Sequence, residues 1–225
     1  MTQHQLEVLP DAAAAARRGA ELIAESAAAA IAERGSFTLA ASGGTEPWQM
    51  YRLLTEYEIE WKKVAVLQVD ERVAPDSDPD RNLTHLLESL PQAARDRVRP
   101  MPVTEEDLEA AAAAYADQLP DSLDLVHLGL GPDGHTASLV PGDPVLEVED
   151  RRVAVTGEYQ GHRRMTLTYP ELELARRIFW LVVGEGKREA LGWLLARDAA
   201  IPAGRVHAHE SIVIADEAAA SDRHH

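Results

Sequence analysis

Apolar segments of strand length alternate with longer segments of helical pattern along most of the chain. The short apolar runs predict strands over residues 37–41, 64–69, 123–128, 153–156, 165–168, 178–183 and 212–214. Between them we expect helices over residues 11–34, from 47 onward, and over 82–90, 104–119 and 187–197. This alternation predicts a three-layer α/β fold, in which helices cover both faces of a mainly parallel sheet.

Several of the expected helices begin or end at residues with a known capping role. Asp11 is the expected N-cap of the first helix, and Gly35 lies just beyond its end. Pro47 occupies the first position of the second helix, where its missing N–H is not needed. Thr104 and Asp107 approximate a capping box, so we expect a helix to begin there.

Four turns rich in glycine or charge directly follow predicted strands, over residues 42–45, 70–72, 131–135 and 184–187. Ligands of open parallel sheets bind outside the carboxyl ends of the strands, so all four turns are expected at one edge. Taken singly, Arg72 and Lys187 are equally consistent with solvated surface charges. The coincidence of the four turns favours a site for a small phosphorylated compound with an electrophilic centre.

The turn after the first predicted strand reads Ser42, Gly43, Gly44, Thr45. Exposed backbone N–H groups at the start of a helix attract anions, and two adjacent glycines let a phosphate approach closely. Such turns also serve simply to reverse the chain. Residues 42–45 are therefore a candidate phosphate loop that gains weight only from the other turns.

Residues 129–142 read GLGPDGHTASLVPG and follow the apolar run 123–128. Glycine and proline end the strand and form a tight turn that presents Asp133 and His135. A carboxylate two residues before an imidazole at such a strand end is typical of a positioned acid/base pair. The alternative is a surface turn whose histidine merely titrates, and the loop alone does not decide between the two.

Three other groups of residues are assigned no chemistry. His127 lies within a buried apolar run and is interpreted as a core residue. His207 and His209 share one face but lack a third metal ligand. The run Asp76, Asp78, Asp80 resembles the start of a calcium loop, but Arg81 and Leu87 occupy positions that require Gly and Glu.

Composition narrows the class of protein. The 225 residues suit one large domain or two small ones, and the excursion 140–152 is too short for an interdomain linker, so we expect one domain over residues 1–225. No apolar segment spans a membrane, and the start has neither a basic region nor an apolar region, so a cytoplasmic protein is expected. The net charge of -16 argues against nucleic acid as a binding partner. We set His224 and His225 aside, since paired terminal histidines are typical of a purification tag.

With these motifs assembled, the sequence resembles the 6-phosphogluconolactonases over nearly its whole length. The resemblance rests on SGGTEP, VDERVAPDSDPDRN, GPDGHTASLVPG, RRMTLT, LVVGEGKREAL and a closing ADEAAA. It implies a Rossmann-like α/β fold shared with glucosamine-6-phosphate deaminases and ribose-5-phosphate isomerases. It also implies hydrolysis of 6-phospho-D-glucono-1,5-lactone in the pentose phosphate pathway, with no cofactor and no metal. We expect a monomer or a weak dimer.

The resemblance implies roles for individual residues. His135 would be the general base that deprotonates water, and Asp133 would orient the water or the imidazole. Contacts to the phosphate or to the developing oxyanion are expected from Ser42, Gly43, Gly44, Thr45, Asp70, Arg72, Arg81, Asn82, His162, Arg163 and Lys187. Two departures stand out: Glu46 occupies a position that is usually Ser or Thr, and the segment before Arg163 lacks prolines that are common there.

Two other functions use similar motifs. Aminosugar-phosphate deaminases also carry an Asp-Gly-His element, but in them an Ile-Ala-Phe-Asn-Glu-Pro run follows the histidine. Here residues 136–141 read TASLVP, and no carboxylate appears before Asp143. A non-catalytic sugar-phosphate sensor is the second alternative; such regulators usually carry a DNA-binding segment, for which a helix beginning by Asp11 leaves no room.

Overall fold

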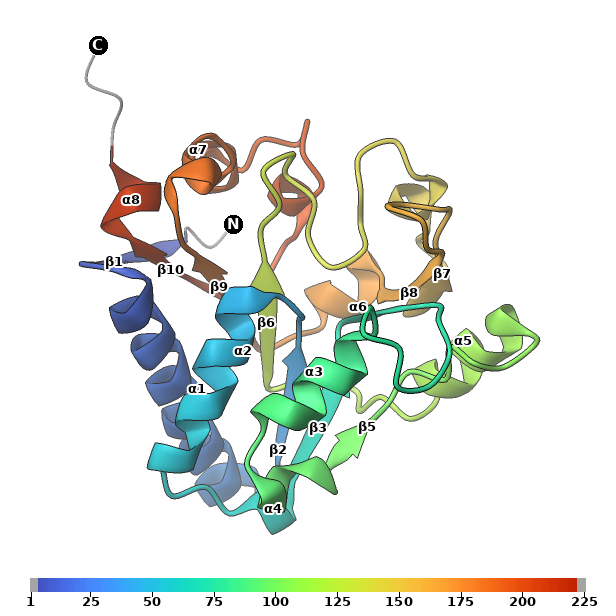
Figure 1. Cartoon of the computed structure of the whole chain (residues 1–225), viewed down its shortest axis with the longest axis horizontal. Helices are drawn as coiled ribbons and strands as arrows, with labels where there is room; N and C mark the ends of the chain where they lie inside the picture. The colour runs from blue at the N-terminus through green and yellow to red at the C-terminus, as the bar shows by residue number, and fades with distance from the viewer. Residues whose placement is uncertain (1–3, 222–225) are drawn as a thin grey trace.

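The computed structural model describes residues 4–221, so the two terminal histidines attributed to a tag lie outside the described residues. Seven strands form one sheet in the order β1-β10-β9-β6-β2-β3-β5, and every neighbouring pair is parallel. The strands are β1 (Gln5–Leu9), β2 (Phe37–Ala41), β3 (Val64–Gln68), β5 (Val98–Arg99), β6 (Leu125–Gly129), β9 (Arg177–Val182) and β10 (Glu210–Asp216). The predicted parallel α/β sheet is confirmed (Figure 1).

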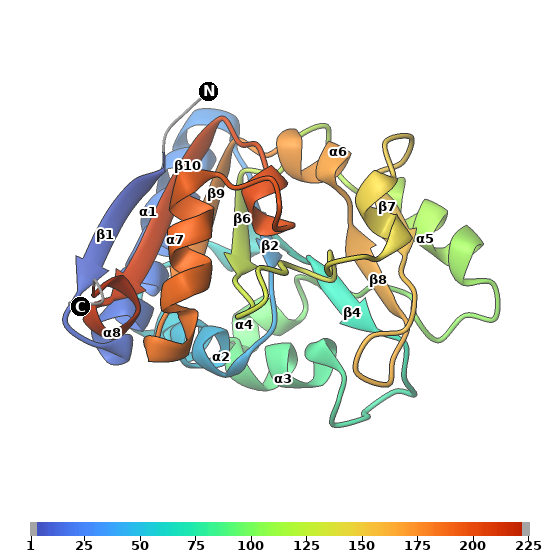
Figure 2. The ribbon, with the colours of Figure 1, turned by 90° about the horizontal axis from the view of Figure 1, so that it is seen from above.

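Helices cover both faces of this sheet, as predicted (Figures 1 and 2). One apolar core lies under α1 (Ala12–Arg34), α2 (Thr45–Arg52), α3 (Asn82–Ser89) and α4 (Gln92–Arg95). The other lies under α5 (Leu108–Ala116), α6 (Tyr169–Glu173), α7 (Arg188–Ala196) and α8 (Glu217–Ala220). Short 3₁₀ turns are η1 (Leu53–Glu56), η2 (Trp61–Lys63), η3 (Pro144–Glu147), η4 (Glu185–Lys187) and η5 (Ala203–Arg205).

The capping signals hold for α1 and need corrections for α2 and α5. Helix α2 begins at Thr45, so Pro47 is its third residue and not its first as predicted. Asp11 accepts a hydrogen bond from the N–H of Ala14, and Gly35 ends the helix in the left-handed conformation at φ 81°. At α5 the N-cap is Asp107, whose side chain accepts from the N–H of Ala110. The helix therefore begins at Leu108 and not at Thr104, because the carboxylate and not the hydroxyl binds the free N–H groups.

A second, smaller sheet was not predicted. It contains three antiparallel strands in the order β4-β8-β7: β4 (Asp70–Arg72), β8 (Arg164–Leu167) and β7 (Val153–Val155). Residues 70–72 were predicted as a turn but form strand β4, because they pair with residues 164–166 far along the chain. The predicted strands near 153 and 165 exist, but they belong to this small sheet.

The edge strand β1 was also missed. Its five residues contain two large apolar side chains that remain exposed, Leu6 at 42% and Val8 at 47%. The alternation of buried and exposed side chains that would indicate a strand in the sequence is therefore weak here. The strand is defined by its pairing with β10. None of the helices within residues 4–221 has the length and apolar character needed to cross a membrane.

The strand order reverses between β2 and β6. From β2 the chain adds β3 and β5 on one side, and from β6 it adds β9 and β10 on the other. Chains that leave neighbouring strands in opposite directions open a crevice at the carboxyl ends of those strands. The fold thus places the turns after β2 and β6 at the position where ligands bind in open α/β sheets.

Candidate active site

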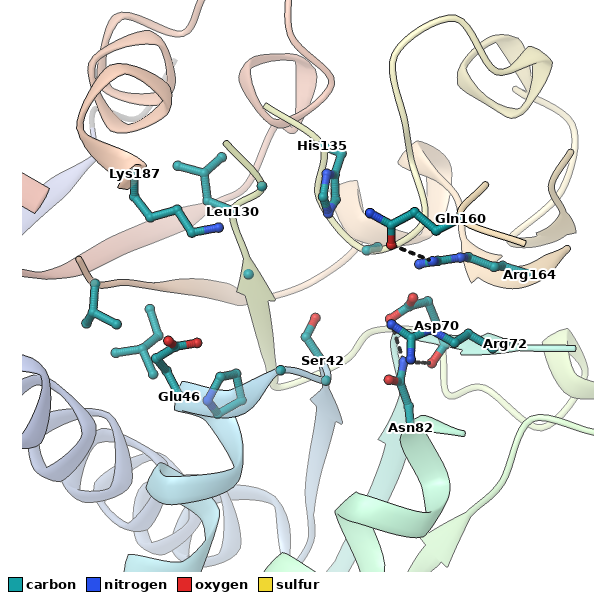
Figure 3. Close-up of a pocket in the computed structure, with 18 residues that line it drawn as sticks. Ser42, Glu46, Asp70, Arg72, Asn82, Leu130, His135, Gln160, Arg164 and Lys187 are labelled. Atoms are coloured by element: carbon teal, nitrogen blue, oxygen red, sulfur yellow. Dashed lines mark hydrogen bonds between the residues drawn. The ribbon is translucent and has the colours of Figure 1, made fainter. Parts of the chain in front are cut away.

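A cavity of about 220 Å³ lies at the carboxyl edge of β2, β6 and β9, between the large sheet and the small one (Figure 3). All four predicted turns contribute to its wall. The predicted residues that line it are Ser42, Gly43, Gly44, Asp70, Arg72, Asn82, His135 and Lys187. The remaining predicted residues, Thr45, Arg81, Asp133, His162 and Arg163, are not part of the lining.

His135 and Asp133 form a hydrogen-bonded pair beside the cavity. The Nδ1 atom of His135 lies 2.5 Å from Oδ1 of Asp133, and the same oxygen accepts the backbone N–H of His135 at 3.2 Å. An ionised carboxylate only accepts hydrogen bonds, so we assign the imidazole proton to Nδ1. Nε2 is then the nitrogen with a free lone pair, and the ring points into the cavity (Figure 3).

The charge state of Asp133 suits this arrangement. Partial burial opposes its ionisation, but the backbone N–H and the imidazole of His135 together lower the pKa of the Asp133 carboxyl below its ordinary value. The carboxylate therefore stays ionised at neutral pH and holds the Nδ1–H tautomer of His135.

Glycine is required at two positions of the turn that carries this pair. A Cβ atom on Gly131 would lie 2.1 Å from Nδ1 of His135, so any other residue at this position would clash with the imidazole. Gly134 has φ 81°, and a Cβ there would meet Ile201 at 2.5 Å. Backbone hydrogen bonds from Gly131 to His135 at 2.8 Å and from Gly134 to Gly131 at 3.0 Å close the turn. The pair is thus held by a rigid backbone.

The loop after β2 leads directly into α2. Gly44 is the N-cap at φ 135°, and no side chain caps the first N–H groups of this helix. Gly43 is confined by Asn82, whose Oδ1 would lie 2.4 Å from an added Cβ. The uncapped helix start and the two glycines fit the predicted anion loop, although Thr45 itself opens α2 without lining the cavity.

Two buried, hydrogen-bonded side chains, Tyr51 and His127, support this loop. The hydroxyl of Tyr51 donates to the carbonyl of Ser42 at 3.2 Å and lies 2.9 Å from Nδ1 of His127. His127 is fully buried, as predicted, and burial lowers its pKa to about 3. The neutral imidazole can therefore donate from Nδ1 to the Tyr51 oxygen, which orients the hydroxyl toward Ser42.

Lys187 and Glu46 face each other across the cavity (Figure 3). Lys187 follows β9 in the turn η4, and Glu46 lies in the first turn of α2. Burial lowers the pKa of the Lys187 ammonium, and the negative charges of Glu46 and Asp133 offset part of that effect. This end of the cavity contains one cation, one anion and open backbone amides.

Asp70 lies at the opposite end, where it is buried. Ser138 donates a hydrogen bond to Asp70 Oδ2 at 2.6 Å, and the Asn82 amide donates to the backbone carbonyl of Asp70 at 3.1 Å. Burial raises the pKa of the Asp70 carboxyl, while Ser138 and the charge of Arg164 act in the other direction. Arg72, two residues further along β4, donates to the carbonyl of Asp80 at 2.8 Å.

Of the two adjacent arginines at 163 and 164, Arg164 lines the cavity, and not Arg163 as predicted. Arg164 is 5% exposed and lines the cavity (Figure 3), whereas Arg163 is exposed and faces a shallow depression near Glu106. Successive side chains of an extended chain point to opposite faces, so only one of two adjacent arginines can face the ligand. The pairing of Arg164 with Arg72 across β8 and β4 decides which one does.

Two more predicted ligands have structural partners outside the cavity. Arg81 is buried and forms ion pairs with Glu71 at 3.1 Å and Asp76 at 3.2 Å. The Glu71 carboxylate also accepts the first N–H groups of α3, at Asn82 and Leu83. Arg81 therefore neutralises the carboxylate that caps α3.

His162 is the other residue placed outside. Its Nε2 lies 3.0 Å from Oδ2 of Asp80, and its Nδ1 lies 3.4 Å from the carbonyl of Val73. These contacts tie the hairpin between β7 and β8 to the loop after β4. His162 thus positions the hairpin, and the cavity wall there is formed by its neighbour Gln160.

Comparison with known proteins now bears on this site. The sequence profile of the family described as "Glucosamine-6-phosphate isomerases/6-phosphogluconolactonase" matches residues 10–214. The chain belongs to this family. A 6-phosphogluconolactonase from Synechocystis sp. is 39% identical over 186 residues, which cover 76% of each chain.

Solved structures agree on the fold. The crystal structure of a 6-phosphogluconolactonase from Shewanella baltica OS155 superposes with a TM-score of 0.86 at 25% identity, covering 96% of this chain and 98% of that one. A monomeric glucosamine-6-phosphate deaminase superposes with a TM-score of 0.81 at 22% identity, covering 96% and 99%. The second similarity concerns the fold alone, and it confirms the prediction that this α/β fold is shared with a glucosamine-6-phosphate deaminase.

Arg164, Gln160 and Tyr159 have polar contacts at the site and were not predicted. Arg164 was overlooked in favour of its neighbour, although strand alternation around residues 164–167 would have placed the two arginines on opposite faces. Gln160 lines the cavity, and Tyr159 contacts the Asp133–His135 pair. The signal for these two was Gly161 between two predicted strand segments, since a glycine in such a position marks a turn.

Proposed function

We propose that this chain is a 6-phosphogluconolactonase, which hydrolyses 6-phospho-D-glucono-1,5-lactone to 6-phosphogluconate in the pentose phosphate pathway. The observation that carries the proposal is the His135–Asp133 pair beside a cavity that has cationic side chains at both ends. The family and the relative from Synechocystis sp. support the substrate class.

The geometry supports a general-base reaction. His135 Nε2 takes a proton from a water molecule as that water attacks the lactone carbonyl carbon. The resulting tetrahedral oxyanion collapses, the bond from that carbon to the ring oxygen breaks, and the ring oxygen receives the proton from the imidazolium. No covalent intermediate is needed, since a lactone is an activated ester, and one positioned base contributes roughly 10²- to 10⁴-fold.

The charged groups divide the remaining tasks. Asp133 keeps the proton on Nδ1 of His135 and stabilises the imidazolium that forms during attack. Lys187, Arg72, Arg164 and the amides of Gly43 and Gly44 surround the cavity and would hold the phosphate and the developing oxyanion. Arg164 replaces Arg163 and Arg81 in this proposal, because those two do not reach the cavity.

A coupled assay that generates the lactone in situ tests the proposal. The expected result is enzymatic turnover above the buffer background for the wild type, and a loss of roughly 10²- to 10⁴-fold in kcat with nearly unchanged KM for His135→Ala. The exposed His209 provides the control, because His209→Ala should keep wild-type rates. Absence of turnover by the wild type, or equal losses in His135→Ala and Arg72→Ala through KM alone, would contradict it.

The deaminase alternative finds less support at the corresponding position. The first carboxylate after His135 along the chain is Asp143, which accepts the backbone N–H groups of Val145 and Gly157 at 2.8 and 2.9 Å. It is therefore engaged in capping η3 and does not line the cavity. Release of ammonia from glucosamine 6-phosphate by the purified protein would favour the deaminase over the lactonase. Binding of 6-phosphogluconate without lactone turnover would favour a sensor.

A further inference from the structure

The hairpin that joins β7 to β8 ends in a tight turn over residues 159–162. Tyr159 and His162 exchange backbone hydrogen bonds at 2.9 and 3.3 Å, and Gln160 and Gly161 between them have φ 52° and 82°. A non-glycine residue in the left-handed region is uncommon and is retained where the surrounding contacts require it. The turn therefore holds Tyr159 and Gln160 in defined positions beside the cavity.

Tyr159 contacts both members of the acid/base pair. Its hydroxyl lies 3.4 Å from Oδ2 of Asp133, the carboxylate oxygen that does not face His135. Its ring packs edge-on against the His135 ring, with centroids 5.7 Å apart. Burial and the nearby Asp133 charge raise the pKa of Tyr159, so the phenol keeps its proton and donates to the carboxylate.

The same side chain also contacts Arg164 of the cavity wall. The guanidinium carbon of Arg164 lies 5.1 Å from the centre of the Tyr159 ring, within the range of a cation–π interaction. Gln160 completes the arrangement: its Oε1 accepts from Arg164 at 3.4 Å (Figure 3), and its amide lies 3.4 Å from the Tyr159 hydroxyl. One tyrosine thus touches the base, the carboxylate behind it and the buried cation.

We propose that Tyr159 is a positioning residue that orients the Asp133–His135 pair and Arg164 as one unit. The inference rests on the proposed function, since it assigns His135 as the base. Asp133 is 40% exposed and has few other contacts that would prevent its carboxylate from rotating. The phenol restrains that rotation and draws part of the carboxylate charge away from the imidazole.

Tyr159→Phe removes only the hydroxyl and separates orientation from packing. We expect kcat to fall about 3- to 10-fold, as for the loss of one hydrogen bond, with KM unchanged. Without the phenol, the Asp133 charge acts more fully on the imidazolium, so the acid limb of the kcat/KM profile should move to higher pH. The other charged groups that face the cavity are Glu46, Asp70, Arg72, Arg164 and Lys187. They are the same in the wild type and in the variant, so a shift of the pH profile is due to the loss of the Tyr159 hydroxyl.

Tyr159→Leu also removes the ring beneath Arg164. It should lower kcat about tenfold further and raise KM, because the guanidinium loses its cation–π partner. Tyr57 lies outside the cavity, and Tyr57→Phe is the matched control that should keep wild-type kinetics. Wild-type kcat and an unshifted pH profile in both Tyr159 variants would overturn the proposal.

An NMR titration of the resting protein provides a readout that needs no turnover. The ring signal of His135 is identified as the one that disappears in His135→Ala, and its midpoint should be higher in Tyr159→Phe than in the wild type. An unchanged midpoint in a folded variant would contradict the role of Tyr159 even if lactone hydrolysis is confirmed. A shifted midpoint without any lactone turnover would instead contradict the proposed function and leave the positioning contact in place.

Discussion

The two ends of the cavity carry similar groups but are built in different ways. The Lys187 end, formed by Gly43, Gly44, Glu46 and Lys187, consists of turns that follow strands of the large parallel sheet. The Arg164 end, formed by Asp70, Arg72, Asn82, Gln160 and Arg164, depends mainly on strands β4 and β8 of the small antiparallel sheet. Strand-end turns are sufficient for the first end, whereas the second exists only through long-range pairing.

The difference in construction is also a difference in solvation. Arg164 is almost fully buried, and burial lowers the pKa of its guanidinium while the charge of Asp70 raises it. Lys187 is half-buried on a turn, and the nearby anions Glu46 and Asp133 are side chains that solvent also reaches. A charge removed from the Arg164 end leaves the buried Asp70 carboxyl without the nearby positive charge of Arg164, whereas a charge removed from the Lys187 end is replaced by water.

Among the changes that test the two ends, the largest effect should come from Arg164→Met compared with Arg163→Met. Loss of the buried cation should lower kcat/KM about 10²- to 10³-fold and the free energy of unfolding by about 1–3 kcal/mol. The exposed neighbour should change the free energy of unfolding by no more than about 0.5 kcal/mol and leave kinetics intact. Steady-state kinetics and urea unfolding measure both quantities. Equal losses in the two variants would show that strand alternation does not separate their roles.

Lys187→Met should have a smaller effect that falls mainly on binding. In the proposed mechanism the ammonium would contact the substrate anion equally in the ground state and in the transition state, so we expect KM to rise about 10- to 100-fold with little change in kcat. Lys63→Met is the control, since Lys63 pairs with Glu60 on the surface. A fall in kcat at unchanged KM would instead place Lys187 at the developing oxyanion.

Much of the Lys187 end was predictable because its signals are local. The loop at residues 42–45 and the turn at 184–187 each follow an apolar run and contain the glycines that their positive φ angles require, as at Gly44 and Gly184. The Asp133–His135 pair was visible for the same reason. Fold class followed from the alternation of these runs with helices.

The Arg164 end could not be predicted to the same degree. Asp70 was placed in a turn because three consecutive charges normally mark solvent, and only its pairing with Thr166 shows that it is buried in a strand. Arg81 was predicted to bind the ligand because nothing in the local sequence shows that it forms an ion pair with Glu71. Burial of charged groups depends on partners distant in sequence, which local patterns do not encode.

His127 supports the loop after β2 through Tyr51, and its burial makes the stability of the fold depend on pH. The folded pKa of His127 is about 3 and the ordinary value is 6.5, so below the ordinary value the unfolded state binds a proton that the folded state excludes. Stability from this residue is therefore complete above the ordinary value and falls as pH decreases. Between about pH 7.5 and pH 5 the loss should be about 2 kcal/mol.

Urea unfolding of His127→Asn tests this contribution. Asparagine can still donate to Tyr51 but does not titrate, so the variant should start less stable and then lose about 2 kcal/mol less than the wild type over the same pH interval. Carboxylates elsewhere, including Asp133, are common to both proteins and cancel in the difference. Parallel pH dependences for the two proteins would mean that His127 is not the group responsible.

The smallest effect is expected from Glu46→Gln, which changes only the balance of charge at the Lys187 end. An anionic substrate that approaches Lys187 also meets the Glu46 carboxylate, and solvent weakens this repulsion. The amide should therefore lower KM about 2- to 5-fold at low ionic strength, with a smaller change at physiological salt, where screening is stronger. A rise in KM would reverse the interpretation, because it would mean that Glu46 accepts a hydrogen bond from a substrate hydroxyl and that the phosphate lies at the Arg164 end.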